Sequence, residues 1–214
     1  MKGRDHVHRD KSEDISTLLR NSRKDKTTLA IIVDKIFLKN REGLFTHDLI
    51  WAFFQAKKPY SLMLIANYLG SEDACDVKLA RELLNFVPHI DMTRGKDSKK
   101  QYIAFRYFLE ENYPFLLFTG ESFQRTSRPV RYIIDLEAKY LCRQLFLDTG
   151  KPLKAYTENE NKLLGYFNKL DEDNKILLSK FSLRIHYENI YLWKSWINNS
   201  ITEQLNIAKA WLRV

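Results

Sequence analysis

The chain has 214 residues, of which 44% are hydrophobic and 29% are charged, a balance that is ordinary for a globular protein. Only seven Gly and five Pro are present, which argues against low-complexity or long disordered stretches outside the ends. Lys and Arg number 35 against 27 acidic residues, which gives a net charge of +8. Because phosphates neutralised by such residues release counterions, the surplus permits a polyanionic partner, but it does not require one.

Neither the N-terminus nor the apolar runs indicate a membrane or secreted protein. The first residues, MKGRDHVHRDKSED, lack the apolar core of a signal peptide. Apolar runs such as LAIIV and PFLLF are far shorter than the roughly 20 residues that a membrane span needs. Cys75 and Cys142 have no second ligand at zinc-site spacing. We therefore expect an intracellular protein, cytoplasmic or nuclear, with no metal, no cofactor and no membrane partner.

The first part of the chain predicts helices. Residues 1–26 form a polar N-terminal segment and a first helix. Residues 27–42 carry apolar side chains at i, i+3, i+4 and i+7, which predicts an amphipathic helix that Gly43 ends. Thr46 is in the position of a cap for the next helix, which Pro59 ends.

The segment that follows Pro59 changes its period along its length. SLMLIANYLG and SEDACDVKLARELLN predict two short helices with a turn at Gly70 and a cap at Ser71. After Asn85, apolar and polar residues alternate, which predicts two strands joined by the basic loop TRGKDSKK. The alternating apolar positions are Ile90 and Met92, then Ile103, Phe105 and Tyr107. A helix over KQYIAFRYFLEEN stays open, because that run suits both periods.

Residues 46–108, read as helix, turn, two helices and hairpin, resemble the winged-helix (helix-turn-helix) superfamily. The resemblance implies a mostly α protein, in which a winged-helix-like domain with one β-hairpin spans 27–118 and a helical domain spans 119–214. The alternative is an all-α helical bundle.

The C-terminal region is helical in character. Pro129 suits the first position of a long helix over 129–148, and Thr157 with Glu160 forms the pattern of a capping box. Asp171 is placed to cap a further helix. The tryptophan-containing end, YLWKSWI and AKAWLRV, predicts helices that pack in the core or serve self-association and partner binding.

Basic residues near the predicted wing are the candidate nucleic-acid contacts. A mobile basic tip beside a helix can grip phosphate or a minor groove. The candidates are Arg94, Lys96, Lys99 and Lys100 in the wing, Lys78 and Arg81 on the second helix of the motif, and Arg125, Arg128 and Arg131 as a further track. The acids of that second helix argue against major-groove recognition: Glu72, Asp73, Asp76 and Glu82 leave a local balance of −2 against its two cations.

The leading hypothesis is a non-enzymatic nucleic-acid-binding protein of regulatory, replication or mobile-element accessory type, with DNA and RNA both open. The main alternative is a protein–protein adaptor on the same scaffold, which uses the acidic helix as one surface. No Gly-rich phosphate loop, HExxH or GxSxG motif is present, and we assign no catalytic residue.

A Mg²⁺-dependent nuclease is the second alternative. Asp135, Glu137 and Lys139 resemble the carboxylate and lysine pattern of restriction-type nuclease cores, with Glu121 as the nearby upstream acid. This chemistry needs Glu137 and Lys139 on a strand, where residues two apart point the same way. On a helix their side chains diverge, and a helix is the interpretation we prefer here.

Overall fold

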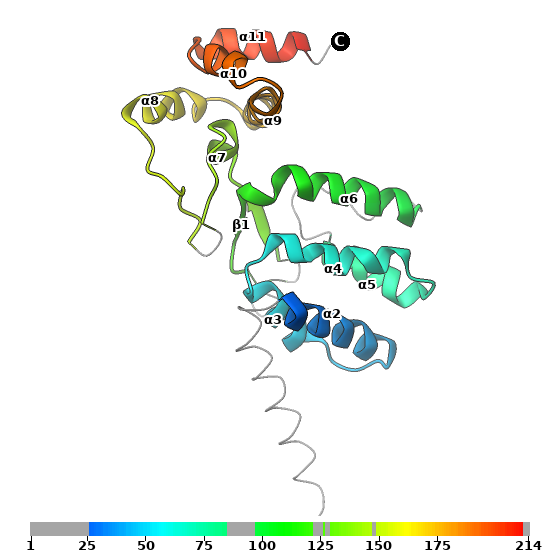
Figure 1. Ribbon diagram of the computed structural model, residues 1–214. Coiled ribbons are helices and arrows are strands. Elements are labelled where there is room, and N and C mark those ends of the chain that lie inside the picture. Colours follow the sequence, from blue (N-terminus) through cyan, green and yellow to red (C-terminus); the bar gives the residue numbers. More distant parts are fainter. Residues whose placement is uncertain (1–25, 85–96, 122–125, 127–128, 147–148, 212–214) are drawn as a thin grey trace, which may run out of the picture. The chain divides into compact units, whose positions relative to one another are not determined.

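The computed structural model describes residues 26–84, 97–121, 126, 129–146 and 149–211. Over these residues the fold is mostly α with one two-stranded sheet and a helical C-terminal region, which confirms the predicted fold class (Figure 1). Internal contacts divide the chain into two compact units. Unit 1 comprises Met1–Tyr113 and Phe118–Ile133, and unit 2 comprises Pro114–Leu117 and Ile134–Val214. No helix within the described ranges is long and apolar enough to cross a membrane.

Unit 1 consists largely of helices joined by short turns. In chain order these are α2 (Lys26–Arg41), α3 (His47–Gln55), η1 (Pro59–Ser61), α4 (Leu62–Ala66), η2 (Asn67–Gly70), α5 (Ala74–Leu84) and α6 (Ser98–Asn112), where η denotes a 3-10 turn. Within the unit, α4 and α5 lie between α2 on one side and α6 on the other (Figure 1). The helices predicted over 27–42 and after Thr46 are therefore confirmed.

The residues predicted to end or cap the helices of unit 1 do so only in part. Gly43 has a φ of 68°, the left-handed conformation that glycine adopts readily after a helix. Thr46 is the N-cap of α3, but its side chain makes no capping hydrogen bond. At α5, Asp73 Oδ1 accepts from the backbone N–H of Cys75 at 2.7 Å, so Asp73 takes the role predicted for Ser71.

The core of unit 1 is aliphatic and aromatic. The inner face of α2 is buried and consists of Leu29, Ile32, Val33, Ile36 and Phe37. The other helices bury Phe53, Phe54, Leu62, Ile65, Leu69, Leu83, Leu84, Phe105 and Leu109. Burial of each such side chain stabilises the fold by about 1.5–3 kcal/mol before the conformational entropy is subtracted.

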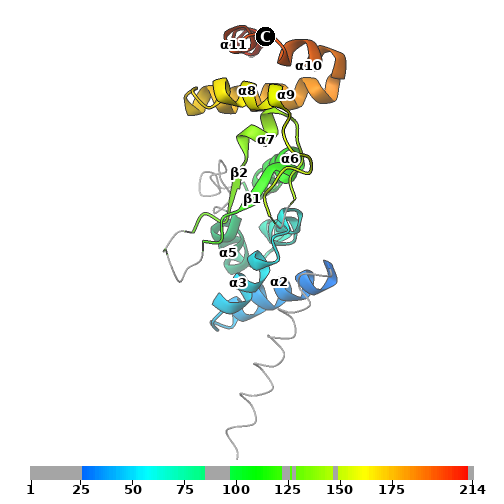
Figure 2. The ribbon, with the colours of Figure 1, turned by 90° about the vertical axis from the view of Figure 1, so that its left-hand side faces the viewer.

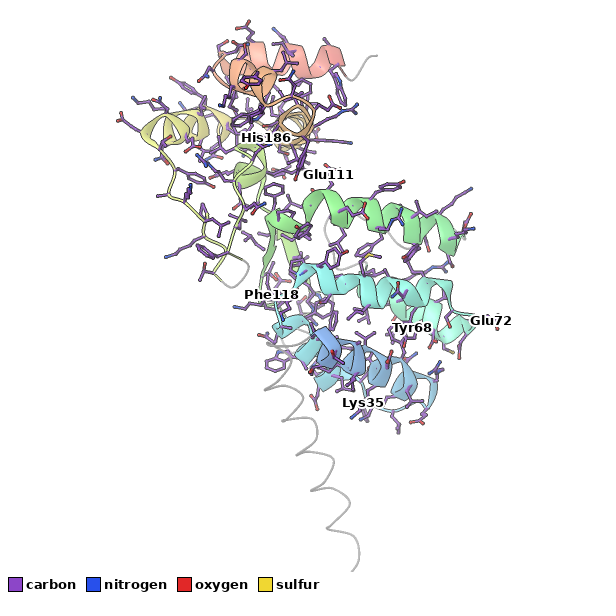
Figure 3. All side chains as sticks on the ribbon, viewed as in Figure 1. Lys35, Tyr68, Glu72, Glu111, Phe118 and His186 are labelled. Atoms are coloured by element: carbon purple, nitrogen blue, oxygen red, sulfur yellow. The ribbon has the colours of Figure 1, made fainter. Side chains whose placement is uncertain are left out.

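Tyr68 closes the edge of this core. Its ring stacks on Phe37 with the centroids 3.6 Å apart, and its hydroxyl donates to Asp34 Oδ1 at 2.7 Å. Figure 3 labels Tyr68 in this unit. Burial and the Asp34 hydrogen bond raise the pKa of Tyr68 to about 12. The phenol is therefore protonated at neutral pH and ties η2 to α2 as a hydrogen-bond donor.

The prediction of a second strand in the wing is wrong, because residues 98–112 form helix α6. The helical period places Phe105 and Leu109 on one buried face, and it leaves Ile103 and Tyr107 exposed. A strand would have put Ile103, Phe105 and Tyr107 on the same face. The first predicted strand, at Ile90 and Met92, lies outside the described residues.

The hairpin lies further along the chain, in β1 (Leu116–Phe118) and β2 (Tyr132–Ile134). The Thr119 N–H donates to Arg131 O at 3.0 Å and the Asp135 N–H to Phe115 O at 2.8 Å, which makes the pair antiparallel. The division between the two units passes through this hairpin. The domain boundary proposed from the sequence, between residues 118 and 119, lies at the end of β1.

The long helix predicted over 129–148 is wrong. Residues 132–134 are the strand β2, with Tyr132 buried and Ile133 exposed in alternation. A short helix, α7 (Leu136–Tyr140), follows, capped by Asp135 Oδ1, which accepts from the Ala138 N–H at 2.8 Å. The β-branched run before Asp135 favours a strand, and this preference outweighs the proline that suggested a helix start.

Unit 2 is completed by four further described helices, α8 (Glu158–Phe167), α9 (Glu172–Glu188), α10 (Ile190–Ile197) and α11 (Ile201–Trp211). The 3-10 turn η3 (Tyr113–Phe115) spans the division between the units. Figure 2 shows α8 and α9 in one layer of the unit, with α10 and α11 in a second. The predicted caps at Thr157 and Asp171 are confirmed, and Thr157 and Glu160 form a reciprocal capping box.

The core of unit 2 is aromatic. Tyr140 of α7 stacks on Phe167 of α8, with the ring centroids 4.4 Å apart, and Trp196 meets Tyr140 edge-on. Aliphatic residues of α9 and Phe181 fill the remaining space. The Tyr140 hydroxyl is buried and donates to Gln204 Oε1 of α11 at 2.6 Å, so a polar contact holds the last helix to this core.

Glu160 links α8 to the segment after α7 and gives the fold an acid-sensitive contact. Arg143 Nη2 and Nε lie 2.6 and 2.9 Å from Glu160 Oε1. Burial raises the pKa of Glu160, but the Thr157 backbone and Arg143 outweigh it, so the net shift is downward. A carboxyl whose pKa is lowered in the folded state stabilises that state above its unfolded pKa, and this stability is lost as pH falls through the folded value.

We therefore expect Glu160→Gln to lower the free energy of unfolding by about 1 kcal/mol at pH 7. The difference from the wild-type protein should shrink as pH falls below about 4. Urea denaturation at pH 7 and at a pH below about 4 measures this difference in the free energy of unfolding. The exposed Glu158→Gln variant is the matched control. A difference that stays constant with pH would show that the ion pair does not contribute.

Candidate nucleic-acid interface

The structure brings two of the predicted cations together in an open groove of about 530 Å³ in unit 1. The groove lies between the exposed side of α5 and the first residue of α6. Its lining residues are Ser71, Glu72, Ala74, Val77, Lys78, Arg81, Glu82 and Ser98. Figure 3 labels Glu72 at this end of the unit. Lys99 and Lys100 follow Ser98 directly and are exposed.

Arg81 joins the two walls of the groove. Its Nε donates to Gln101 Oε1 at 2.9 Å, and its Nη2 donates to Ser98 Oγ at 3.0 Å. Both acceptors belong to the first turn of α6, so the guanidinium fixes the position of that turn relative to α5. Arg81 is therefore part of the scaffold of the groove as well as one of its cations.

Asp97 orders the start of α6 and with it the two lysines. Its Oδ1 accepts from the backbone N–H groups of Lys99 and Lys100, each at 3.1 Å. The hydrogen bond from the Lys100 N–H, together with the Lys100 charge and the Lys99 N–H, outweighs desolvation and lowers the pKa of Asp97. Lys99 and Lys100 thus lie on a capped helical turn, whereas the sequence placed them in a loop between strands.

Asp76, one of the acids that argue against nucleic-acid contact, is not at the surface. It is 1% exposed, and its Oδ2 accepts from Arg41 Nη1 at 3.2 Å and from Ser71 Oγ at 3.0 Å. Asp73 is engaged in capping α5. The acidic balance of α5 counted from the sequence therefore overstates the negative charge that α5 presents to a ligand. This pairing could not be predicted from the sequence, because Arg41 lies on α2, far from Asp76 in the chain.

The charge of the groove remains mixed. Lys78 and Arg81 oppose Glu72 and Glu82 among the lining residues. The adjacent turn adds Lys99 and Lys100 against Asp97, which leaves a balance of +1. The field is thus modest, and phosphate contact would depend on individual lysines rather than on a broad basic patch.

Arg131, predicted as part of a second phosphate track, is buried. Its side chain is 1% exposed, with the guanidinium carbon 4.8 Å from the centre of the Phe54 ring. Its Nη1 donates to Glu121 O at 2.5 Å, and burial lowers its pKa. Arg131 therefore packs inside unit 1 and is not available to a phosphate. The other two members of that track, Arg125 and Arg128, lie outside the described residues, as do Arg94 and Lys96.

The residues of the nuclease pattern do not have the geometry that the reaction needs. Glu137 and Lys139 lie on helix α7, where their side chains diverge, and Lys139 is buried. Asp135 caps that helix, and Glu137 accepts from Asn168 Nδ2 at 2.8 Å. Across the described part of the chain, no group of three His, Cys, Asp or Glu side chains could hold a metal ion.

A second surface, at the corner between α9 and α10, carries exposed aromatic residues. Tyr187 and Tyr191 are 74% and 79% exposed, and Ile190 and Leu192 beside Tyr191 are exposed as well. The tryptophans of the same region pack inward: Trp196 is buried and Trp193 is half-buried. The sequence pattern singled out the tryptophans and did not distinguish the tyrosines, because α10 shows its apolar residues on more than one side.

Comparison of the chain with protein-family models, with curated proteins and with solved structures finds no match.

Proposed function

We propose that the protein is a non-enzymatic nucleic-acid-binding protein whose unit 1 contacts the phosphate backbone at the groove between α5 and α6. The observation that supports this proposal is an open groove lined by Lys78 and Arg81, with Arg81 holding its two walls together. The exposed Lys99 and Lys100 follow the lining residue Ser98 directly in the chain. Such contacts are electrostatic and carry no sequence preference. A net charge of +8 favours encounter with a polyanion.

The winged-helix resemblance remains part of this proposal in a reduced form. The order of α4, η2 and α5 is that of a helix-turn-helix pair. Since residues 98–112 are helical, the basic contact assigned to a wing passes to the first turn of α6. Arg94 and Lys96 stay predicted contacts that precede this turn in the chain.

The test is the salt dependence of binding. A labelled DNA duplex is titrated with the protein between about 50 and 200 mM salt, and fluorescence anisotropy gives the affinity. Each phosphate contact contributes about 0.9 to the slope of log K against log salt. Replacing Lys78, Lys99 and Lys100 with Ala should lower the affinity at least about tenfold at low salt and reduce the slope by about 3.

A matched variant controls for net charge. Lys151, Lys154 and Lys169 are exposed on unit 2, and their replacement by Ala changes the net charge by the same amount. We expect this control to bind DNA nearly as the wild-type protein does. Equal losses in the two variants, or no binding at low salt, would contradict the proposal.

A protein partner is the second candidate, and the mixed charge of the groove favours it. Glu72 and Glu82 lie beside Lys78 in the same lining, an arrangement that suits a partner with both signs of charge. This candidate predicts that a partner stays bound after nuclease treatment and that Glu72→Lys with Glu82→Lys abolishes its binding. The same double variant should strengthen binding to DNA if the first proposal is correct.

A further inference from the structure

The corner between α9 and α10 presents two tyrosine rings to solvent on a rigid support. Tyr187 lies in the last turn of α9 and Tyr191 in the first turn of α10, and about three quarters of each side chain is exposed. Ile190 and Leu192 are exposed as well, so aromatic and apolar side chains gather on both sides of Asn189, the residue between the two helices.

Asn189 fixes the direction of α10 at this corner. Its side chain accepts from the backbone N–H groups of Tyr191 and Leu192 at 2.9 and 3.1 Å, and its own N–H donates to Ile185 O at 2.8 Å. These bonds hold the end of one helix and the start of the next in a set geometry. The backbones that carry the two tyrosines are therefore ordered before any ligand binds.

Trp193 holds α10 against α9 from below the corner. Its Nε1 donates to Ser182 Oγ at 2.8 Å, and its ring meets the His186 ring edge-on, with the centroids 5.0 Å apart. Figure 3 labels His186 on this part of α9. Trp193 and His186 are thus half-buried where α10 packs on α9, whereas the side chains of Tyr187 and Tyr191 are exposed to solvent.

The segment that carries the two tyrosines has a net positive charge. Residues 180–197 contain Lys180, Arg184 and Lys194 and a single acid, Glu188. Glu188 Oε1 lies 2.7 Å from Arg184 Nε, so these two charges offset each other, and the exposed Lys180 and Lys194 leave the surplus. Exposed aromatic rings beside lysines are the combination that binds single-stranded nucleic acid, because bases stack on the rings and the phosphates meet the cations.

We propose that the α9–α10 corner stacks unpaired bases of single-stranded DNA or RNA on Tyr187 and Tyr191. This inference rests on the proposed nucleic-acid binding and specifies its preferred substrate: a strand with free bases binds more tightly than a duplex, which offers phosphate contacts alone. Unit 1 supplies phosphate contacts, and the corner of unit 2 supplies contacts to bases. Sequence preference at the corner is weak, since every base has a face that can stack.

The test uses two single-stranded probes of about 12 nucleotides, oligo(dT) and an abasic oligomer with the same phosphodiester backbone. We compare the wild-type protein with a Tyr187→Ala, Tyr191→Ala double variant by fluorescence anisotropy. The double variant should bind oligo(dT) at least tenfold more weakly and should bind the abasic probe as the wild-type protein does. A Tyr187→Phe, Tyr191→Phe variant keeps both rings and should retain the affinity for oligo(dT).

The outcomes separate this inference from the proposal for unit 1. Loss of the base-dependent affinity only in the alanine variant supports stacking, even if the unit 1 lysine variant has no effect. An alanine variant that binds both probes like the wild-type protein overturns the inference and leaves the unit 1 groove intact. If sedimentation instead shows a concentration-dependent dimer that the alanine variant abolishes, the corner binds a second copy of the chain and the inference is wrong.

Discussion

Replacing Gln204 with Leu is expected to lower the free energy of unfolding of unit 2 by about 2–4 kcal/mol. Gln204 is fully buried in α11, and its side chain makes three hydrogen bonds. Oε1 accepts from the Tyr140 hydroxyl at 2.6 Å, and Nε2 donates to Ile197 O and Asn199 O at 3.0 and 2.9 Å. Leu has a similar volume, so the loss comes from polar groups left without partners rather than from a cavity.

Tryptophan fluorescence during urea denaturation measures this loss, because Trp193, Trp196 and Trp211 all belong to unit 2. Asn206→Leu provides the matched control: it lies on the exposed side of the same helix and should change the stability by less than about 0.5 kcal/mol. Tyr140→Phe removes one of the three hydrogen bonds and should cost about 1 kcal/mol. Equal effects of Gln204→Leu and Asn206→Leu would show that the buried network does not hold α11.

Replacing Arg131 with Ala is expected to destabilise unit 1 by about 3 kcal/mol. The substitution removes a fully buried side chain from the Phe54 ring and takes the donor away from Glu121 O. Arg131→Met keeps most of the volume and the contact with the ring, so it should cost about half as much. Far-UV circular dichroism during urea denaturation measures both variants.

The same pair of variants tests the position of Arg131 against the phosphate track predicted from the sequence. Arg131→Met should leave the DNA affinity and its salt slope unchanged, because a buried guanidinium releases no counterions on binding. A fall in the slope by about 1 would mean that Arg131 contacts phosphate, and it would contradict the buried position. Lys99→Met provides the exposed comparison, for which we expect such a fall.

Helical periodicity and capping residues could be predicted from the sequence because they are local. Thr157, Glu160 and Asp171 fix their helix ends through side chains within three residues, and the apolar face of α2 repeats within one segment. Residues 98–112 show the limit of this approach. Both periods fit the run, and the structure adopts a helix because Phe105 and Leu109 can then share one buried face.

The candidate site was predicted only in part, because its electrostatics depend on contacts between distant segments. Asp76 looks like a surface acid until Arg41, on another helix, pairs with it. Arg131 is a candidate surface cation in the sequence, but in the structure its guanidinium lies on the Phe54 ring. A net charge computed from the sequence includes every charged side chain, whereas buried charged side chains cannot contact a partner. Lys78, Lys99 and Lys100 are exposed, as most lysines are, and their role as nucleic-acid contacts stays a prediction.

The assignment of residues 118–133 to unit 1 has a consequence for synthesis of the protein. Tyr132 and Arg131 both pack on Phe54, so the core of unit 1 includes residues that follow a segment of unit 2 in the chain. A nascent chain that has reached only Tyr113 therefore lacks part of that core. The ribosome must add the hairpin before unit 1 is complete, and a fragment that ends at Tyr113 would leave the Phe54 ring without this cover.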